Sequence, residues 1–503
     1  MLYVCLIVVF ASIVLHDQVG GNLPYELLGI SPGSTMTLWL VPVLHVVMGV
    51  VIQAAAIRAY HAIERTNRLR PIESLDAIVA AARICGALLT AVSVCLLGYL
   101  DAVRSVVGDT VLLDEALTIA PFLLLIVAGW WSVYPVERIV RDSTLVRDLD
   151  EGRPIYPPPT RWQFVWSHAR HQLFILLVPM VLLSAWGDAT EAVLRAAVHQ
   201  ADGGSGWLAP LGRFVITQSN AAQLTYAAVK LSGLLLIVAA APLLIRRIWD
   251  TTPLVEGAIA QGLLKMCEQQ GVKVRRLLVW RTGGTMINGA VLGMVGGARY
   301  ILLTDALLDY LPGHFVQAVM AHEIGHVRCK HVPWLTATLF AVSGVCLVAA
   351  DLVLTHLVGI DVNHASPSLQ LAASGGAVVV AVFAFGYVSR RFEWQADAFA
   401  VKHISAHTPP TDDPAAPWQP SVTVTRPAVA AMCGALETVA VANHLPRDRF
   451  TFRHGSISTR INRLLQLEGI PLDRLPIDRG VRRIKLLIGL SCLLVIAATL
   501  GLL

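Results

Sequence analysis

The feature that most constrains the fold of this chain is a series of nine apolar runs, most of them close to 20 residues long. A helix of about 20 apolar residues can cross the hydrocarbon core of a bilayer. Only 15% of the 503 residues are charged, whereas soluble domains average about one quarter. The chain is therefore predicted to be mainly α-helical and to cross a membrane repeatedly. The candidate spans lie at about 1–16, 36–57, 84–100, 116–134, 172–186, 231–245, 335–352, 371–388 and 486–503.

The distribution of arginine predicts which loops face the cytoplasm. Arginines gather in 58–83 and 136–170, whereas 17–35 and 358–370 contain no Lys or Arg. Cytoplasmic loops of membrane proteins carry the excess of Lys and Arg, so the first pair of stretches is assigned to that side. Nine crossings then alternate without conflict, with the amino terminus inside and the carboxyl terminus outside.

A metal-binding motif lies between the sixth and seventh spans, where residues 322–326 read His-Glu-Ile-Gly-His. On a helix, His322 and His326 share one face, so their two imidazoles can bind one Zn²⁺. Glu323 can then reach a water on the metal as a general base. Catalytic zinc commonly takes two His, one Glu and a water, and Glu393 can supply the carboxylate. We therefore expect one Zn²⁺ per chain.

The sequence around this motif predicts how the ligands come together. Two spans lie between His326 and Glu393, and two crossings return the chain to the side on which it started. Asp397 stands one helical turn beyond Glu393 and can hydrogen-bond a ligand imidazole. Strands are predicted at 272–280, 285–292 and 300–304, and a helix beginning at Pro312 leads into the motif. The ligands should therefore meet in a mixed α+β domain.

Several other features point away from alternative functions. The eight cysteines form no C-x-x-C pair, so neither a disulfide framework nor a Cys-based zinc site is expected. The net charge of +5 is modest, and no nucleic-acid partner is predicted. His331 is expected not to bind the metal, because the zinc is already satisfied.

The pattern resembles the integral-membrane gluzincins that include the CAAX prenyl endopeptidases and HtpX. The resemblance rests on His322-Glu323-x-x-His326, on the string Ser-Arg-Arg-Phe-Glu-x-x-Ala-Asp at 389–397, and on the two spans between them. It covers about 250–465 and is closer to the CAAX-protease branch. It implies a polytopic α-helical membrane protein with a zincin-like α+β metallopeptidase domain on its cytoplasmic face.

The resemblance also implies roles for three further residues. Asn288 would bind substrate on an edge strand, although Gly289 stands where the family usually has Ala. His454 would help stabilise the transition state, although Gly follows it where the family often has Pro. Arg460 would tie the following helix to the active site.

The apolar runs and the material between them divide the chain into segments. These are a six-span membrane region at 1–245, peptidase parts at 246–334 and 389–482, two spans within 335–388, and a last span at 483–503.

The sequence thus predicts a membrane-embedded zinc endopeptidase in which Glu323 is the base. Its partners would be the lipid bilayer and a peptide or protein substrate, with membrane-associated and lipidated substrates included. Two alternatives remain open: a quality-control protease similar to HtpX, and a non-catalytic membrane scaffold. Because residues 499–503 carry no retention signal for the endoplasmic reticulum, a bacterial inner membrane is favoured over that compartment.

Overall fold

The structure, a computed structural model, describes residues 2–19, 35–66, 70–110, 112–150, 152, 155–204, 206–217, 219–284, 286–293, 296–360, 365–407, 421–443 and 445–499. The chain divides into two compact units. Unit 1 comprises Met1–Asp150 and Pro157–Ile248, and unit 2 comprises Glu151–Tyr156 and Trp249–Leu503. The ends of the first and last predicted spans, Met1 and 500–503, lie outside the described residues.

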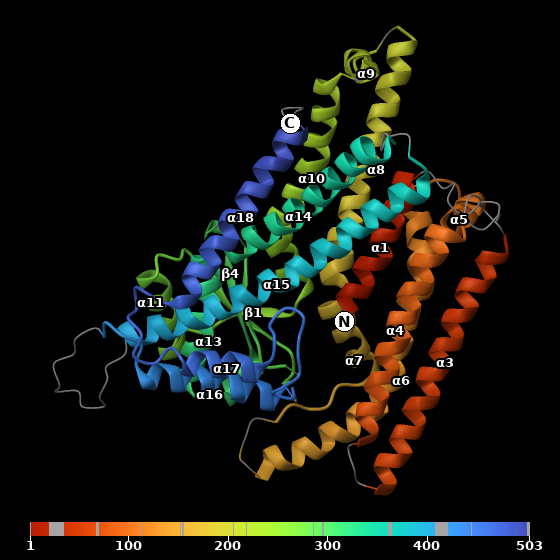
Figure 1. The fold of residues 1–503 in the computed structure, drawn as a ribbon. Helices are drawn as coiled ribbons and strands as arrows, with labels where there is room; N and C mark the ends of the chain where they lie inside the picture. Colours follow the sequence, from red (N-terminus) through yellow and green to blue (C-terminus); the bar gives the residue numbers. More distant parts are fainter. Residues whose placement is uncertain are drawn as a thin grey trace. The chain divides into compact units, whose positions relative to one another are not determined.

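In the described residues of unit 1, all regular secondary structure is helical (Figure 1). Its apolar core lies between α1, α3, α4 and α6, where Leu6, Ile52 and Phe122 are almost fully buried. At Gly86 of α4 the α6 helix comes so close that an added Cβ would lie 2.7 Å from Cδ2 of Leu125. The helices are α1 Leu2–Val19, α3 Thr35–Thr66, α4 Arg70–Leu96, α5 Tyr99–Val107, α6 Leu113–Asp150, α7 Arg161–His168, α8 Phe174–Asp202, α9 Ala209–Ile216 and α10 Asn220–Ile248.

Eight of the nine predicted spans lie in one helical segment each over their described residues, whereas the third, 84–100, runs past the end of α4 at Leu96 into α5. Seven stretches of the described residues are long and apolar enough to cross a membrane: Thr35–Thr66, Arg70–Leu96, Leu113–Ser143, Arg161–Asp202, Ala228–Ile248, His331–His356 and Ser368–His407. The first predicted span forms the shorter apolar helix Leu2–Asp17, and the last lies in α18, whose first turns carry charged side chains. The multi-span helical fold is confirmed, whereas the count of nine and the sidedness stay predictions.

Unit 2 contains a four-stranded sheet with the order β1-β2-β4-β3. The central strand β4, Tyr300–Thr304, runs parallel to β2, Arg276–Trp280, and antiparallel to the edge strand β3, Gly289–Leu292. Every residue of β4 is buried, as its uninterrupted apolar sequence predicts. The short strand β1, Thr251–Pro253, pairs antiparallel with β2 and was not predicted from the sequence. The predicted strands at 272–280 and 285–292 are shorter in the structure.

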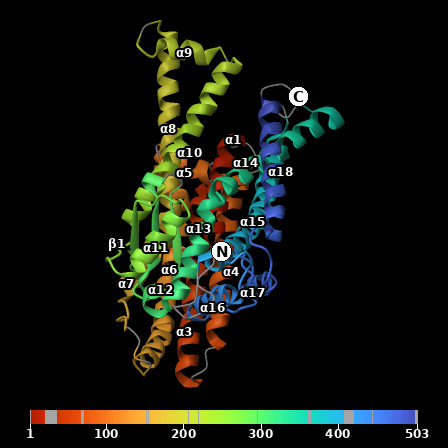
Figure 2. The ribbon, with the colours of Figure 1, turned by 90° about the vertical axis from the view of Figure 1, so that its left-hand side faces the viewer.

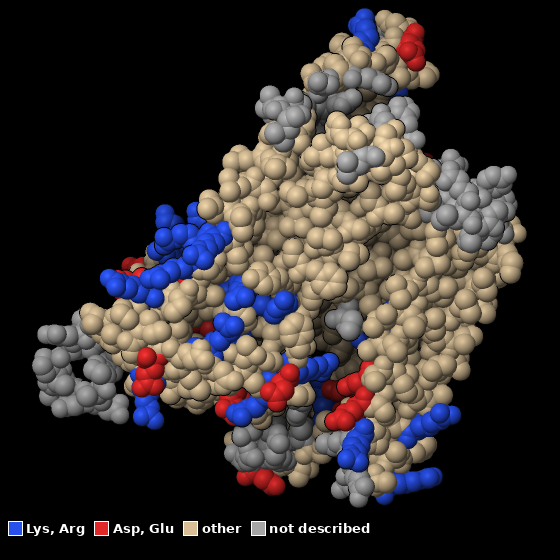
Figure 3. Space-filling model, in the orientation of Figure 1, with Lys and Arg blue, Asp and Glu red and all other residues tan. Residues whose placement is uncertain are grey.

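Eight α-helices in the described part of unit 2 surround this sheet or extend from it, and α14, α15 and α18 contain long apolar stretches. In Figures 1 and 2, α13 lies beside the strands, and it also packs against α15 and α16. On the face in Figure 3, charged side chains are nearly absent from the upper lengths of α14, α15 and α18, and Lys and Arg gather near the base of α18. The helices are α11 Ala258–Gln269, α12 Asp305–Tyr310, α13 Gly313–Arg328, α14 His331–Val353, α15 Pro367–His407, α16 Arg426–Ala442, α17 Ile457–Leu465 and α18 Pro476–Thr499.

Candidate metal centre

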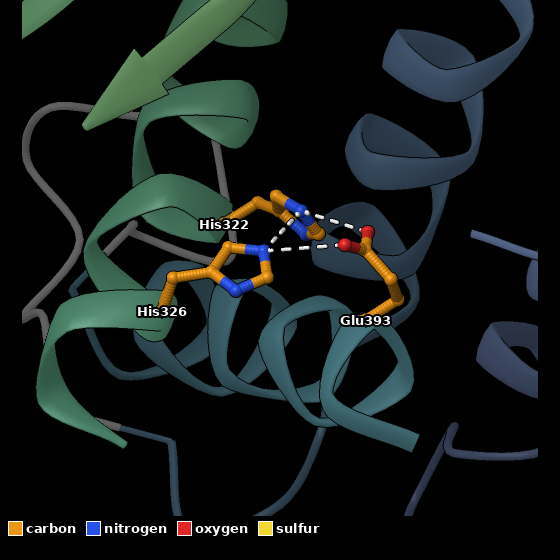
Figure 4. Close-up of side chains that lie close together, drawn as sticks. All are labelled: His322, His326 and Glu393. Atoms are coloured by element: carbon orange, nitrogen blue, oxygen red, sulfur yellow. Dashed lines mark hydrogen bonds and ion pairs between the residues drawn. The ribbon is translucent and has the colours of Figure 1, made fainter. Parts of the chain in front are cut away.

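Two helices of unit 2 bring the three predicted metal ligands together. His322 and His326 lie one turn apart on α13, and Glu393 faces them from α15 (Figure 4). The two Nε2 atoms are 3.1 Å apart, and the Glu393 carboxylate oxygens lie 3.5 Å from Nε2 of His322 and 3.7 Å from Nε2 of His326. One donor atom from each residue thus lies within 4.8 Å of the others. The predicted ligand set is one cluster in space.

The chemistry of this cluster fits a bound cation. Nδ1 of His322 lies 2.8 Å from Oδ1 of Asp397, a carboxylate that attracts the N–H of the ring and leaves the lone pair on Nε2. That lone pair points toward Nε2 of His326 and the Glu393 carboxylate, and electron-rich atoms at such distances repel each other unless a cation or a proton lies between them. Two imidazoles and one carboxylate form a donor set typical of catalytic zinc.

A glycine allows the two ligand helices to approach. A Cβ built on Gly325 of α13 would lie 3.2 Å from Cα of Ala396 and 3.2 Å from Cβ of Phe399, both on α15. Such contacts are tighter than side chains normally make, and one of them is with the backbone. The Gly of the His-Glu-Ile-Gly-His motif therefore sets the distance between the histidines and Glu393.

We expect Gly325→Val to separate the ligand helices and weaken metal binding. Overpacking of a tight contact costs about 1–3 kcal/mol, and here the strain acts directly on the ligand geometry. The measurement is zinc per chain after dialysis of the detergent-purified protein. Gly313→Val is the matched control, because a Cβ at Gly313, at the start of the same helix, meets nothing within 4 Å. Full zinc retention by Gly325→Val would contradict this reading of the contact.

A buried ion pair between Arg460 and Asp397 lies next to the cluster. Arg460 of α17 donates from Nε to Oδ2 of Asp397 at 2.8 Å and from Nη2 to Oδ1 at 2.6 Å. Its Nη1 also lies 3.7 Å from Oε2 of Glu393. Burial alone would lower the pKa of Arg460, but Asp397 and Glu393 raise it, so the guanidinium stays charged. The expected tie between α17 and the site is therefore a bidentate arginine–carboxylate pair.

The enclosed setting changes the proton affinity of the residues on α13. Burial is the main cause that raises the pKa of Glu323 to about 7; the charge of His322 opposes the rise and that of Glu393 adds to it. Burial would lower the pKa of His322, but Asp397 and Glu393 raise it to about 10, so Nε2 favours a bound proton or another cation in its place. For His326 burial dominates and lowers the pKa well below its usual value. Burial thus acts in opposite directions on the pKa of the carboxyl of Glu323 and of the imidazole of His326.

His454 lies beside the third ligand. Its Nδ1 is 3.0 Å from Oε1 of Glu393, and half of its side chain is exposed. It belongs to a tight turn in which Thr451 and Gly455 exchange backbone hydrogen bonds. Gly455 has a φ of +76°, which proline cannot adopt, so this turn requires the departure from His-Pro. The position suits a donor to a substrate, and that role stays a prediction.

Asn288 lies just before the edge strand β3 and is exposed. Its backbone N–H donates to Oγ1 of Thr304 at 3.0 Å, and its carbonyl accepts from the N–H of Thr304 at 3.0 Å. It is Gly289 that approaches α13, where an added Cβ would lie 3.1 Å from Cγ1 of Val319 and, in ordinary contact, 3.5 Å from Cγ of Glu323. A side chain at position 289 would therefore crowd Val319, on the helix that carries Glu323. The role of Asn288 in substrate binding stays a prediction.

His331, which the sequence argument had set aside as a ligand, also lies at the site. His331 is fully buried, and its Nδ1 lies 2.8 Å from Nδ1 of His326, on the side of that ring away from the other ligands. It is thus a neighbour of His326, and the expectation that it does not bind the metal stays a prediction. Its other partner is Gln395, within the 389–397 string. That string and the spacing of five residues from His326 were the only sequence features that pointed to a place for His331 at the site.

The part of the chain that contains this site is similar to known peptidases. Residues 255–468 match the family model of Peptidase family M48. The CAAX prenyl protease 1 homolog of Arabidopsis thaliana is 27% identical over 171 residues, which cover 32% of this chain and 40% of that protein. The protease HtpX homolog of Aeropyrum pernix is 26% identical over 170 residues, or 33% of this chain and 53% of that protein.

Two further similarities are more limited. The plastoglobule-localized metallopeptidase 48 of Arabidopsis thaliana is 39% identical over 49 residues, which cover 10% of this chain and 14% of that protein. The crystal structure of S. mikatae Ste24p aligns with 86% of this chain and 99% of its own, at 13% identity and a TM-score of 0.43. The chain thus spans between 14% and 53% of the length of the curated relatives it matches.

Proposed function

From the match of residues 255–468 to Peptidase family M48, we propose that the chain is a zinc-dependent membrane endopeptidase of this family. The observation that carries the proposal is the convergence of His322, His326 and Glu393 within 4.8 Å, with Glu323 on the same helix. These three residues would hold one Zn²⁺. When bound, the zinc would lower the pKa of a water molecule and polarise the carbonyl of the scissile peptide.

The residues of the chain would then move the protons. Glu323 takes a proton from the attacking water, which its place on α13 between the two histidines allows it to reach. It later gives this proton to the leaving amine. His454, half-exposed beside Glu393, donates a hydrogen bond to the oxygen that gains negative charge in the transition state. Asp397 holds His322 in place, and Arg460 holds Asp397.

The edge strand β3 would hold the substrate. In the described residues β3 pairs only with β4, so its other edge can accept an extended peptide as an added strand. Asn288 lies at the start of that edge. An extended peptide there would run beside α13, which carries Glu323.

We further propose that the site faces the cytoplasm, as the arginine-rich loops favour, and that the seven apolar helices cross the bilayer. The relatives named as a CAAX prenyl protease homolog and an HtpX homolog suggest two substrate classes. One class is peptides with a lipidated carboxyl terminus, and the other is unmodified membrane proteins.

The test is peptide cleavage by the detergent-purified chain, before and after zinc is removed with a chelator. We expect one zinc per chain, loss of cleavage after its removal, and recovery on adding about one equivalent of Zn²⁺. A prenylated peptide and its plain counterpart distinguish the two substrate classes. Cleavage that persists without metal would refute the proposed chemistry. A chain that binds zinc and cleaves neither peptide would favour the non-catalytic scaffold.

A further inference from the structure

A chain of hydrogen bonds, buried at its centre and part-buried at both ends, leads from His326 to the start of α18. Nδ1 of His326 lies 2.8 Å from Nδ1 of His331 on α14. Nε2 of His331 lies 3.0 Å from Oε1 of Gln395 on α15, and Nε2 of Gln395 donates to Oδ1 of Asp478 on α18 at 2.6 Å. Four helices thus contribute one residue each to a single line of contacts.

The carboxylate of Asp478 determines which atom donates in each of these hydrogen bonds. A carboxylate can only accept hydrogen bonds, so Gln395 must turn its NH₂ group toward Asp478 and its carbonyl oxygen toward His331. That oxygen can only accept, so His331 carries its hydrogen on Nε2. Nδ1 of His331 is then an acceptor, and the ring of His326 must donate from its own Nδ1. The lone pair of His326 is left on Nε2, the atom that faces His322 and Glu393.

Burial and ring stacking hold this order of donors and acceptors in place. His331 is 0% exposed and Gln395 is 8% exposed, so water competes little for their polar atoms. The His331 ring stacks on Phe392 with centroids 4.4 Å apart and an interplanar angle of 8°. The stacking fixes the plane in which both ring nitrogens must find partners. Asp478 is therefore the residue that decides which atoms donate and which accept. Histidine and glutamine could each present a donor or an acceptor to either neighbour, whereas a carboxylate can only accept.

We propose that His331, Gln395 and Asp478 are positioning residues that set the tautomer of His326 so that Nε2 is free for the metal. The two histidine ligands are then oriented by different means. His322 has a carboxylate, Asp397, next to its Nδ1, whereas His326 reaches its carboxylate through two intervening side chains. The proposal rests on the metal centre of the proposed function, and it makes the first turn of α18 part of that centre.

Asp478→Asn should weaken zinc binding with almost no change in shape. An amide at position 478 can present either its oxygen or its NH₂ group, so Gln395 is free to turn over. Each such reversal would move the hydrogen of His326 onto Nε2 and block the ligand position. Loss of a residue that orients a metal ligand typically costs 10–100-fold in metal affinity, and we expect about 10-fold here.

An exchange of the two polar residues tests this order of donors and acceptors. Gln395→Glu alone places two carboxylates in contact and should also weaken zinc binding. In the double variant Gln395→Glu/Asp478→Asn, the carboxylate at 395 accepts from Nε2 of His331 and from the amide at 478. The hydrogen of His331 is again fixed on Nε2, so the double variant should bind zinc within about threefold of the wild type, given a loss of about 10-fold in each single variant.

The measurement is the zinc Kd of the full detergent-purified chain, from competition with a chelator of known affinity. Asp473→Asn is the matched control, because the Asp473 side chain is 75% exposed and lies in the segment just before α18. Elution volume and helical circular dichroism report folding of each variant. An unchanged Kd in Asp478→Asn, or a folded double variant as weak as the single ones, would overturn the proposal. A wild-type chain that binds no zinc would instead refute the proposed function.

Discussion

Glu323→Gln should leave one zinc bound per chain and reduce peptide cleavage by about 10²–10⁴-fold, the usual contribution of a general base. The substitution keeps the length and shape of the side chain, and Glu323 is not one of the three clustered donors. An amide cannot take a proton from water, so the loss should appear in kcat while substrate binding changes little. Zinc content and kcat/KM of the same preparation are the two measurements.

The control for this variant is the same substitution at an exposed position outside the site. Glu268 on α11 is exposed, so Glu268→Gln should cleave at the wild-type rate. Glu323→Gln with near wild-type cleavage would remove Glu323 from the mechanism. Loss of zinc from this variant would indicate that the glutamate holds the site together and would leave its role as a base unsupported.

The parts of the site that the sequence predicted depend on short-range geometry. His322, Glu323 and His326 follow from helical periodicity, and Glu393 follows from the ligand chemistry of zinc together with two intervening spans. The apolar runs likewise predict helices because length and composition alone decide whether a segment can cross a bilayer. These inferences need no knowledge of how distant elements pack.

The parts that the sequence could not predict depend on packing between distant elements. Asp478 lies 2.6 Å from Gln395 only because α15 and α18 pack side by side, and nothing in its local sequence indicates that contact. The strand β1 has three residues, too few for a periodic pattern, and it exists because β2 offers it an edge. His331 was set aside as a ligand, and its position next to Nδ1 of His326 could be found only from the coordinates.

Arg460→Met should be the most destabilising single change considered for unit 2. It would leave the buried carboxylate of Asp397 without its bidentate partner, and breaking a buried pair typically costs about 3–5 kcal/mol. The uncompensated charge also lies next to Glu393, so the two carboxylates would repel each other. We expect a lower apparent melting temperature of the purified protein, with and without zinc, and weaker zinc binding.

Neutralising the partner separates stability from metal binding. In Arg460→Met/Asp397→Asn the buried charge is gone, so much of the lost stability should return. Zinc affinity should stay low, because Nδ1 of His322 then faces a neutral amide that orients the ring less firmly than the carboxylate 2.8 Å away. Arg474→Met, at a side chain 73% exposed, is the control and should change neither quantity. If the double variant regained both stability and zinc affinity, Asp397 would serve only to neutralise Arg460, and the orienting role assigned to it would be wrong.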